Sequence, residues 1–269
     1  MNKPKLVAEI SANHNGSIAV AKKLIKTAKI NGADFVKLQT YTPNTMTINS
    51  NNKYFKISKG LWKGKTLWEL YDKAQTPFEW QKELFDYAKK LKIKCFSTPF
   101  DESAVDLLEG IGCPIYKISS FEMNDLNLIK KVSKTGKPLI ISTGLANLDE
   151  IEKSFKTARR NGAKNITLLY CVSNYPSTTD NFNMNNLILM KKKFKCKVGL
   201  SDHSKDPMVA TAAIACGAEL IEKHIALENQ KKGFDIEFSL KGKEIKEFVN
   251  NMNKSYQLFK RKNFYRDKK

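Results

Sequence analysis

The chain has 269 residues, of which 41% are hydrophobic and 10% aromatic, so its composition excludes a disordered protein and allows a sizeable core. No run of about 18 apolar residues could span a bilayer, and the N-terminus enters a strand-like segment rather than a signal peptide. We therefore expect a cytoplasmic protein. The five cysteines lack the paired spacing of zinc or disulfide sites, which predicts buried free thiols.

The formal net charge of +20 would suit a nucleic-acid partner or any other anion. The excess is nearly all lysine, however, and arginine, the preferred bidentate ligand of phosphate and guanine, occurs at only four positions. No aromatic and basic single-strand motif or helix-turn-helix is visible. The charge thus indicates a solvated, lysine-rich surface that could gather an anionic substrate, and we expect no nucleic-acid or membrane partner.

Short β-branched or apolar runs alternate along the chain with segments of helical period. The predicted strands are Leu6–Ile10, Phe35–Gln39, Lys94–Ser97, Ile115–Ile118, Leu139–Ser142, Ile166–Tyr170, Lys197–Ser201 and Glu219–His224. The predicted helices cover 18–31, 78–91, 102–110, 125–134, 148–161, 183–193, 207–216 and 243–260. Eight βα units predict an α/β protein with a closed TIM (β/α)8 barrel. An open doubly wound sheet is the alternative, but no glycine-rich dinucleotide loop follows the first strand.

Residues 41–76 form a long connection between the second predicted strand and its helix. It carries Tyr54, Phe55, Trp62 and Trp68 among lysines and glycines. Connections of this length are either functional or disordered, and the aromatic content argues against disorder. We predict a lid or substrate-binding loop. The basic end of the chain, 260–269, is predicted to be a frayed tail.

All eight predicted strands end in polar residues, where a TIM barrel places its reaction centre. They include Glu9, Lys37, Gln39, Thr98, Lys117, Ser120, Glu122, Ser142, Ser173, Tyr175, Ser201, His203 and His224. Any single one could be a helix cap or a solvated side chain. Their recurrence on eight consecutive units favours a site, because burying Lys37 between Val36 and Leu38 costs several kcal/mol unless an anion compensates it. Two lysines and a ring of hydroxyls suit a small phosphorylated, carboxylated ligand.

The three histidines, His14, His203 and His224, all fall in strand-end segments. His203 and His224 end neighbouring strands, and two imidazoles at one barrel face can hold a divalent cation with positions left for water and substrate. The alternative is that they hydrogen-bond substrate or backbone directly. Asp235, in the segment after the eighth strand, is placed to bind sugar hydroxyls or the water on such a metal.

These segments, taken together, resemble a known family. The matching stretches are Ala8–Gly16, Val36–Thr40, Ser97–Phe100, Tyr116–Ser120, Ser142–Gly144, Gly199–His203 and Glu222–His224. In order and along the whole chain, they resemble the signature of the sialic-acid synthase family. Ser11-Ala12 and the stretch Gly60–Leu67 are similar to its pseudaminic acid synthase branch rather than to the N-acetylneuraminate or legionaminate branches, which remain the alternatives.

The resemblance implies a transferase that condenses phosphoenolpyruvate with an acetamido sugar, 2,4-diacetamido-2,4,6-trideoxy-L-altrose for this branch, and releases phosphate. It implies that His203 and His224 hold Mn²⁺ or Mg²⁺ and that Glu9 acts as a base or hydroxyl anchor. The residues implied for phosphoenolpyruvate are Lys37, Thr98, Lys117, Ser142, Ser173 and Ser201. Those implied for the sugar are Gln39, Ser120, Glu122, Tyr175 and Asp235. A 3-deoxy-heptulosonate synthase would need sugar-phosphate contacts that the sequence does not show.

One departure from the family concerns the end of the chain. Members usually continue into a small C-terminal antifreeze-like domain, which reaches across a dimer and places an arginine at the partner's sugar site. The predicted barrel here runs to the last residues, so we expect a single domain over 1–269, a homodimer, and an antifreeze-like domain that is missing or separately encoded. A barrel that binds substrates but does not turn over without that domain therefore stays an alternative to an active synthase.

Overall fold

The chain folds as a closed parallel β-barrel surrounded by helices. The computed structural model describes residues 2–60 and 62–260. The barrel strands are β1 (Lys5–Glu9), β2 (Phe35–Thr40), β3 (Lys94–Pro99), β4 (Tyr116–Ile118), β5 (Leu139–Ser142), β6 (Ile166–Cys171), β7 (Lys197–Asp202) and β8 (Leu220–Ala226). They pair in chain order, and β1 also pairs in parallel with β8, with Val7 opposite Glu222. The predicted TIM barrel is confirmed, and the open sheet is excluded.

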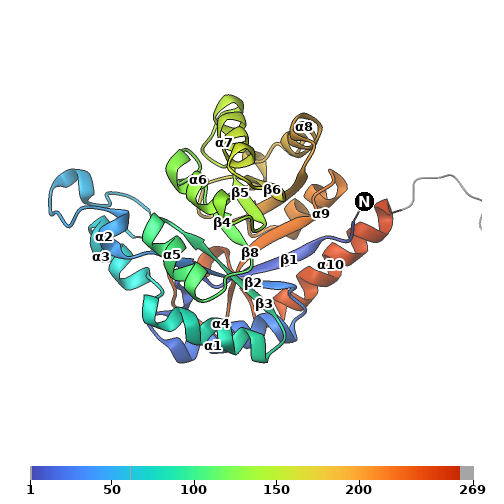
Figure 1. Cartoon of the computed structure of the whole chain (residues 1–269). Helices are drawn as coiled ribbons and strands as arrows, with labels where there is room; N and C mark the ends of the chain where they lie inside the picture. Colours follow the sequence, from blue (N-terminus) through green and yellow to red (C-terminus); the bar gives the residue numbers. More distant parts are fainter. Residues whose placement is uncertain (1, 61, 261–269) are drawn as a thin grey trace, which may run out of the picture.

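Each barrel strand is followed by a helix on the outside. These helices are α1 (Ile18–Ile30), α4 (Phe78–Lys90), α5 (Glu102–Gly110), α6 (Leu126–Lys134), α7 (Leu148–Arg160), α8 (Asn185–Phe194), α9 (Pro207–Ala215) and α10 (Glu244–Phe259). In Figure 1, α6, α7 and α8 lie above the barrel and α1 and α4 below it. No helix in the described part of the chain is both long and apolar enough to cross a membrane.

Local sequence signals explain where these helices begin and which of their faces is buried. Helix α7 begins with a capping box, in which the Asn147 side chain accepts from the backbone N–H of Glu150 and the Glu150 side chain from that of Asn147. Its buried Ile151 and Ala158 are spaced by two helical turns and face the sheet. The chain then leaves the helix at Gly162, whose φ of 105° an L side chain rarely adopts.

The amino-terminal half of the barrel interior is apolar. Phe35 of β2 and Phe96 of β3 make an edge-to-face contact with ring centroids 6.0 Å apart. On β7, a Cβ at Gly199 would lie 2.2 Å from the carbonyl oxygen of Leu220 and 2.7 Å from Leu169, so only glycine fits there. The interior near the amino-terminal ends of the strands is therefore a packed core, and polar side chains gather in its other half, toward the carboxyl end.

The long connection after β2 is more ordered than the sequence indicated. It contains α2 (Pro43–Met46), a 3-10 turn at Lys53–Phe55, and α3 (Leu67–Ala74), which begins with a Thr66–Glu69 capping box. The prediction of a loop over 41–76 is thus wrong for α2 and α3. The other short elements are 3-10 turns at Ser11–His14, Thr179–Asn181 and Ile236–Phe238, and β9 (Leu240–Lys241) beside β8. The tail from 261 onward lies outside the described residues.

Candidate active site

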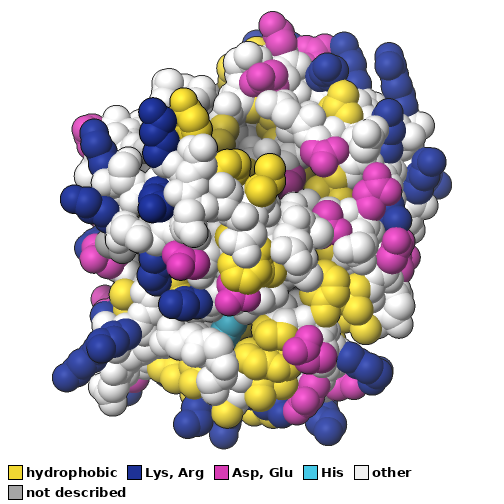
Figure 2. Space-filling model, turned by 90° about the vertical axis from the view of Figure 1, so that its left-hand side faces the viewer, with side chains coloured by type: hydrophobic (Ala, Val, Ile, Leu, Met, Phe, Trp, Pro, Cys, Tyr) yellow, Lys and Arg dark blue, Asp and Glu magenta, His cyan; other side chains and the backbone are white. Residues whose placement is uncertain are grey.

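A cavity of about 530 Å³ opens at the carboxyl end of the barrel. Figure 2 views the molecule from the side on which α2 and α3 lie in Figure 1; its surface is hollowed, with hydrophobic side chains near the middle and lysines mainly at the rim. Twelve of the predicted site residues line the cavity: Lys37, Gln39, Lys117, Ser120, Glu122, Ser142, Ser173, Tyr175, Ser201, His203, His224 and Asp235. Residues of α3 and its surroundings, including Leu70 and Tyr71, close one side, so the long connection does contribute a wall to the cavity.

Two lysines and two glutamates form what we call the inner cluster: Glu9, Lys37, Lys117 and Glu222. Lys37 Nζ lies 2.5 Å from Glu9 Oε2 and 3.4 Å from Glu222 Oε1. Lys117 Nζ donates to the same Glu222 oxygen at 3.0 Å. All four side chains are at most 4% exposed. The anion that the buried Lys37 requires is therefore supplied by the protein itself, a point that the sequence argument missed.

The two lysines of the inner cluster differ in how firmly they hold their proton. Burial alone would lower the pKa of Lys37, but the carboxylates of Glu222 and Glu9 outweigh it and raise that pKa above its ordinary value. Burial prevails at Lys117, whose pKa lies below its ordinary value despite Glu222. Glu222 would have its pKa raised by burial, yet Lys117 and Lys37 hold it below the usual range. Lys37 is thus fixed by two acids, while Lys117 has one and is the cation more open to a ligand.

Glu9 and Thr98 lie beneath the cavity rather than on its surface, and both contact Lys37. Glu9 is fully buried, pairs with Lys37 and accepts from the backbone N–H of Ser11 at 2.6 Å. Thr98 Oγ1 accepts from Lys37 Nζ at 3.2 Å. This placement favours a role for Glu9 as the counterion of Lys37 over the predicted role as a base.

Two serine hydroxyls in the cavity lack a protein partner. Ser142 Oγ and Ser173 Oγ are buried and have no hydrogen-bond partner among the described residues, whereas Ser201 Oγ donates to Glu222 at 3.0 Å. A buried hydroxyl without a partner costs about 1–3 kcal/mol, so these two groups are available to a polar ligand beside Lys117.

His203 and His224 stand side by side, with ring centroids 5.4 Å apart. His203 Nδ1 lies 3.1 Å from the carbonyl oxygen of Val172, an acceptor, so Nδ1 carries the hydrogen and Nε2 a lone pair. Burial lowers the pKa of His203 to about 3, which keeps the ring neutral near pH 7. His224 Nδ1 is 3.3 Å from Asp235 Oδ2 but makes no hydrogen bond within the described chain.

The donor set fits a divalent cation held through two imidazoles. The buried, neutral His203 offers a lone pair, and His224 Nδ1 faces the Asp235 carboxylate at 3.3 Å, which leaves the Nε2 of His224 for a metal. Among the described residues, no group of three or more His, Cys, Asp or Glu side chains is arranged to hold a metal. Any such cation would therefore need further ligands from substrate or water.

His14 does not belong to this pair, although it too follows a strand. Its Nε2 lies 3.1 Å from Thr76 Oγ1, and its Nδ1 accepts from the backbone N–H of Gly16. Burial lowers the pKa of His14 to about 4, so it is a neutral link between the turn after β1 and the end of the long connection. Its neighbour Asn13, which sequence reasoning gave no role, accepts from the backbone N–H of Asp235 and thereby fixes that acid.

The predicted sugar residues all line the cavity. The Tyr175 ring packs on His203 with centroids 4.4 Å apart. Burial raises the pKa of Glu122 to about 7, and its carboxylate contacts Ser119 Oγ. Ser120 Oγ accepts from the backbone N–H of Gly144 at 3.0 Å, while the Gln39 side chain lines the wall. A half-protonated Glu122 near neutral pH can both donate and accept hydrogen bonds, which suits an uncharged ligand rich in hydroxyls or amides.

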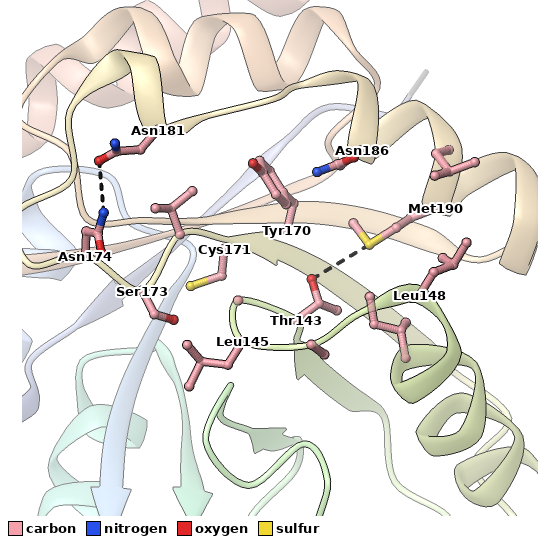
Figure 3. A pocket seen from close by; sticks show the side chains of 15 residues that line it. Thr143, Leu145, Leu148, Tyr170, Cys171, Ser173, Asn174, Asn181, Asn186 and Met190 are labelled. Atoms are coloured by element: carbon pink, nitrogen blue, oxygen red, sulfur yellow. Dashed lines mark hydrogen bonds between the residues drawn. The ribbon is translucent and has the colours of Figure 1, made fainter.

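A second cavity of about 430 Å³ adjoins the first, between the loop after β5 and helix α8. Figure 3 shows its lining, in which Ser173 and Cys171 also belong to the first cavity. None of the described side chains that line it carries a charge; they are chiefly leucines, Met190 and asparagines. Of these two adjoining cavities, the first therefore holds the charged groups that could bind an anion and promote a reaction.

Comparison with known sequences accounts for this arrangement. A model of the NeuB family matches residues 24–263. The chain belongs to the NeuB family. The pseudaminic acid synthase of Helicobacter pylori is 46% identical to it over 237 residues, which cover 88% of this chain and 70% of that protein. An N,N'-diacetyllegionaminic acid synthase of Campylobacter jejuni is 39% identical over 249 residues, which cover 91% and 74%.

A solved NeuB-type structure has the same fold. The N-acetylneuraminic acid synthetase of Leptospira borgpetersenii, crystallised with citrate, superposes with a TM-score of 0.88 at 27% identity and covers 99% of this chain and 88% of that one. The family and the barrel that the sequence motifs predicted are both confirmed. The roles of the individual site residues stay predictions.

Proposed function

We propose that this NeuB-family chain condenses phosphoenolpyruvate with an open-chain 2,4-diacetamido-2,4,6-trideoxy sugar, L-altrose in configuration, to give a nonulosonic acid and phosphate. The proposal is supported by its 46% identity to a pseudaminic acid synthase over 88% of the chain. The site agrees in kind: it has paired lysines and free hydroxyls for an anion, two imidazoles, and further polar side chains for a sugar.

The reaction needs three changes at defined atoms. C3 of phosphoenolpyruvate forms a bond to the aldehyde carbon, whose oxygen takes up a proton; water adds to C2 and loses a proton; and the C2–O bond to phosphate breaks as the ketone forms. Mn²⁺ or Mg²⁺ held by His203 and His224 would supply a Lewis acid for the aldehyde oxygen. The protein's remaining task is to hold two substrates at reacting distance and to exclude competing water.

The inner cluster and the free hydroxyls are suited to phosphoenolpyruvate. Lys117, with its single acidic partner, and the unpartnered Ser142 and Ser173 hydroxyls lie together at the carboxyl ends of β4, β5 and β6. We assign the carboxylate and phosphate of phosphoenolpyruvate to these groups, with Lys37 and Ser201 completing the set; Thr98, predicted for the same set, lies beneath the cavity and accepts from Lys37. Glu9 holds Lys37 in place from below.

The part of the cavity around Tyr175 and Glu122 is suited to the sugar. Tyr175 offers a ring face, and Gln39, Ser120, Glu122 and Asp235 offer polar atoms to hydroxyl and acetamido groups. A Glu122 with a pKa of about 7 can donate to a carbonyl oxygen of an acetamido group when protonated. The residues of the long connection cover this part and shield the reacting carbons from solvent.

A legionaminate synthase is the second candidate, because an N,N'-diacetyllegionaminic acid synthase is 39% identical to this chain. The two activities differ in the configuration of the sugar. The purified chain, supplied with phosphoenolpyruvate and Mn²⁺, is tested with stereoisomers of the diacetamido sugar and with a mono-acetamido hexose. The L-altro isomer should give the highest kcat/KM for phosphate release. A preference for another stereoisomer would replace the first candidate with the second.

A further inference from the structure

A second buried ion pair lies behind the two histidines, on the face of β7 and β8 that points away from the barrel interior. Because strand side chains alternate, Ser201 and Glu222 face inward, and Asp202 and Lys223 face the helices. Asp202 and Lys223 are register partners on neighbouring strands. Their side chains are 0% and 3% exposed, and Lys223 Nζ lies 3.1 Å from Asp202 Oδ2. We call Asp202 and Lys223 the outer pair.

The outer pair is bonded to the turn that carries His203. Asp202 Oδ1 accepts from the backbone N–H of Ser204 at 2.8 Å and from its hydroxyl at 2.6 Å. Lys223 Nζ donates to the carbonyl oxygen of the same Ser204. His203 is therefore flanked on both sides by residues that the outer pair ties together, and its own carbonyl oxygen accepts from Ser177 N–H at 3.1 Å.

The same lysine also fixes the other histidine through the chain. Lys223 directly precedes His224 on β8, and its ammonium group reaches across to β7. One cation thus joins the backbone beside His224 to the turn around His203. Two apolar side chains could fill this space without the cost of burying ions. The ion pair adds directional hydrogen bonds, because each one is made to a defined atom of the turn.

We propose that Asp202 and Lys223 are positioning residues, which set the separation and orientation of the His203 and His224 rings. The identity of the ligand that the two rings hold rests on the proposed function, whereas the placement of the rings does not. Neither side chain lines the 530 Å³ cavity that holds the histidines; Lys223 lines a separate cavity of about 640 Å³ on the outer side of the strands, so the outer pair acts on the site through the histidines.

The test uses the double variant Asp202→Asn/Lys223→Met of the whole chain, which removes the pair without leaving a buried charge. Mn²⁺ binding is measured by titration calorimetry without substrates, and the ring signals are read by NMR after histidine labelling. The chain has only three histidines, so His14 serves as an internal reference. Lys205→Met is the matched control, because Lys205 lies in the same turn with a side chain 62% exposed.

We expect Mn²⁺ affinity to fall about 10- to 100-fold, with shifted His203 and His224 signals and an unchanged His14 signal. Wild-type affinity together with unchanged ring signals in the folded double variant would overturn the proposal. If the double variant does not fold, Asp202→Asn/Lys223→Gln, which places two neutral amides in the same space and leaves no buried charge, is judged by the same two measurements. A wild-type chain that binds no Mn²⁺ would count against the metal in the proposed function, and the ring signals would then decide the positioning role alone.

Discussion

The inner cluster and the outer pair are two groups of buried charges on opposite faces of the barrel strands, and they differ in the groups that they contact. Lys37 and Lys117 of the inner cluster line the cavity, and unpartnered hydroxyls of Ser142 and Ser173 lie in the same wall. Asp202 and Lys223 satisfy each other and one turn of backbone. Burial of charge therefore does not identify a site by itself, and neither does a position at a cavity, since Lys223 also lines one; the distinguishing feature is a buried group that still has bonding capacity to spare.

The strongest test of this distinction is Lys117→Met, which removes the inner-cluster cation with a single acidic partner. It should reduce kcat/KM for phosphoenolpyruvate by roughly 10²–10³-fold, as the loss of one charged donor in an active site does. Initial rates of phosphate release measure it. Lys131→Met is the control, since Lys131 pairs with Asp106 outside the cavity and its loss should leave the rate unchanged. Equal losses in both variants would contradict the assignment.

The next largest effect concerns the charge of the inner cluster, where two lysines face two glutamates and so contribute no net positive charge. A trianionic ligand therefore needs the two charges of a divalent cation nearby. We expect the Kd of phosphoenolpyruvate, measured by calorimetry, to rise roughly 10-fold when the metal is removed by chelation, an effect of about 1.4 kcal/mol. In a His203→Ala/His224→Ala variant, Mn²⁺ should make no difference. Metal-independent binding would show that the lysines suffice.

Most of this architecture could be predicted from the sequence, because the alternation of strands with helices and the polar residues at the strand ends are local signals. The predicted bounds of β5 and α5 agree with the structure to the residue. Helix α3 was missed, although its Thr66–Glu69 capping box is visible in the sequence. The aromatic and glycine content of the surrounding stretch indicated a loop instead.

The partners of the buried charges could not be read from the sequence in the same way. Glu222 has the same inward parity as His224, but its contact with Lys117 joins residues 105 positions apart and depends on barrel closure. The outer pair depends likewise on the β7–β8 register. Most of the polar residues that line the cavity were thus predictable one by one, whereas the part played by Glu222 and the pairing of the charges required the fold.

A smaller effect is expected from Glu122→Gln, in the cavity wall. Because burial raises the pKa of Glu122 to about 7, the wild-type side chain loses its donor proton as the pH rises through 7. The sugar KM should therefore rise several-fold between pH 6 and about pH 8 in the wild type and stay flat in the variant, which donates at every pH. A pH profile of KM that is the same in both proteins would rule out this role.

The raised pKa of Glu122 also predicts how the free energy of unfolding depends on pH. The folded chain holds the Glu122 proton more tightly than the unfolded chain, whose ordinary value is 4.5. This group therefore lowers the free energy of unfolding progressively as the pH rises from 4.5 to about 7. Urea unfolding at pH 5 and about pH 8 should show Glu122→Gln gaining stability relative to the wild type at the higher pH. A constant difference would contradict the buried position.

The smallest effect concerns the long connection. Thr66→Ala removes the cap of α3 and should cost about 1 kcal/mol locally. Because Leu70 and Tyr71 of α3 line the cavity, the sugar KM should rise about twofold to fivefold, within the range of that energy, with the phosphoenolpyruvate KM unchanged. Thr66→Ser, which keeps the hydroxyl, is the control. An equal change in both KM values would mean that α3 does not act on the sugar side alone.

The central claim is that the inner cluster and the two histidines together form a site that joins phosphoenolpyruvate to an acetamido sugar. Its most direct test is the stoichiometry of phosphate and nonulosonic acid formed by the purified chain. With Mn²⁺, phosphoenolpyruvate and the diacetamido sugar all present, the two products should appear in equal amounts, and omission of the sugar or the metal should abolish both. Failure to release phosphate with any stereoisomer of the sugar, or release that does not depend on the sugar, would contradict the account.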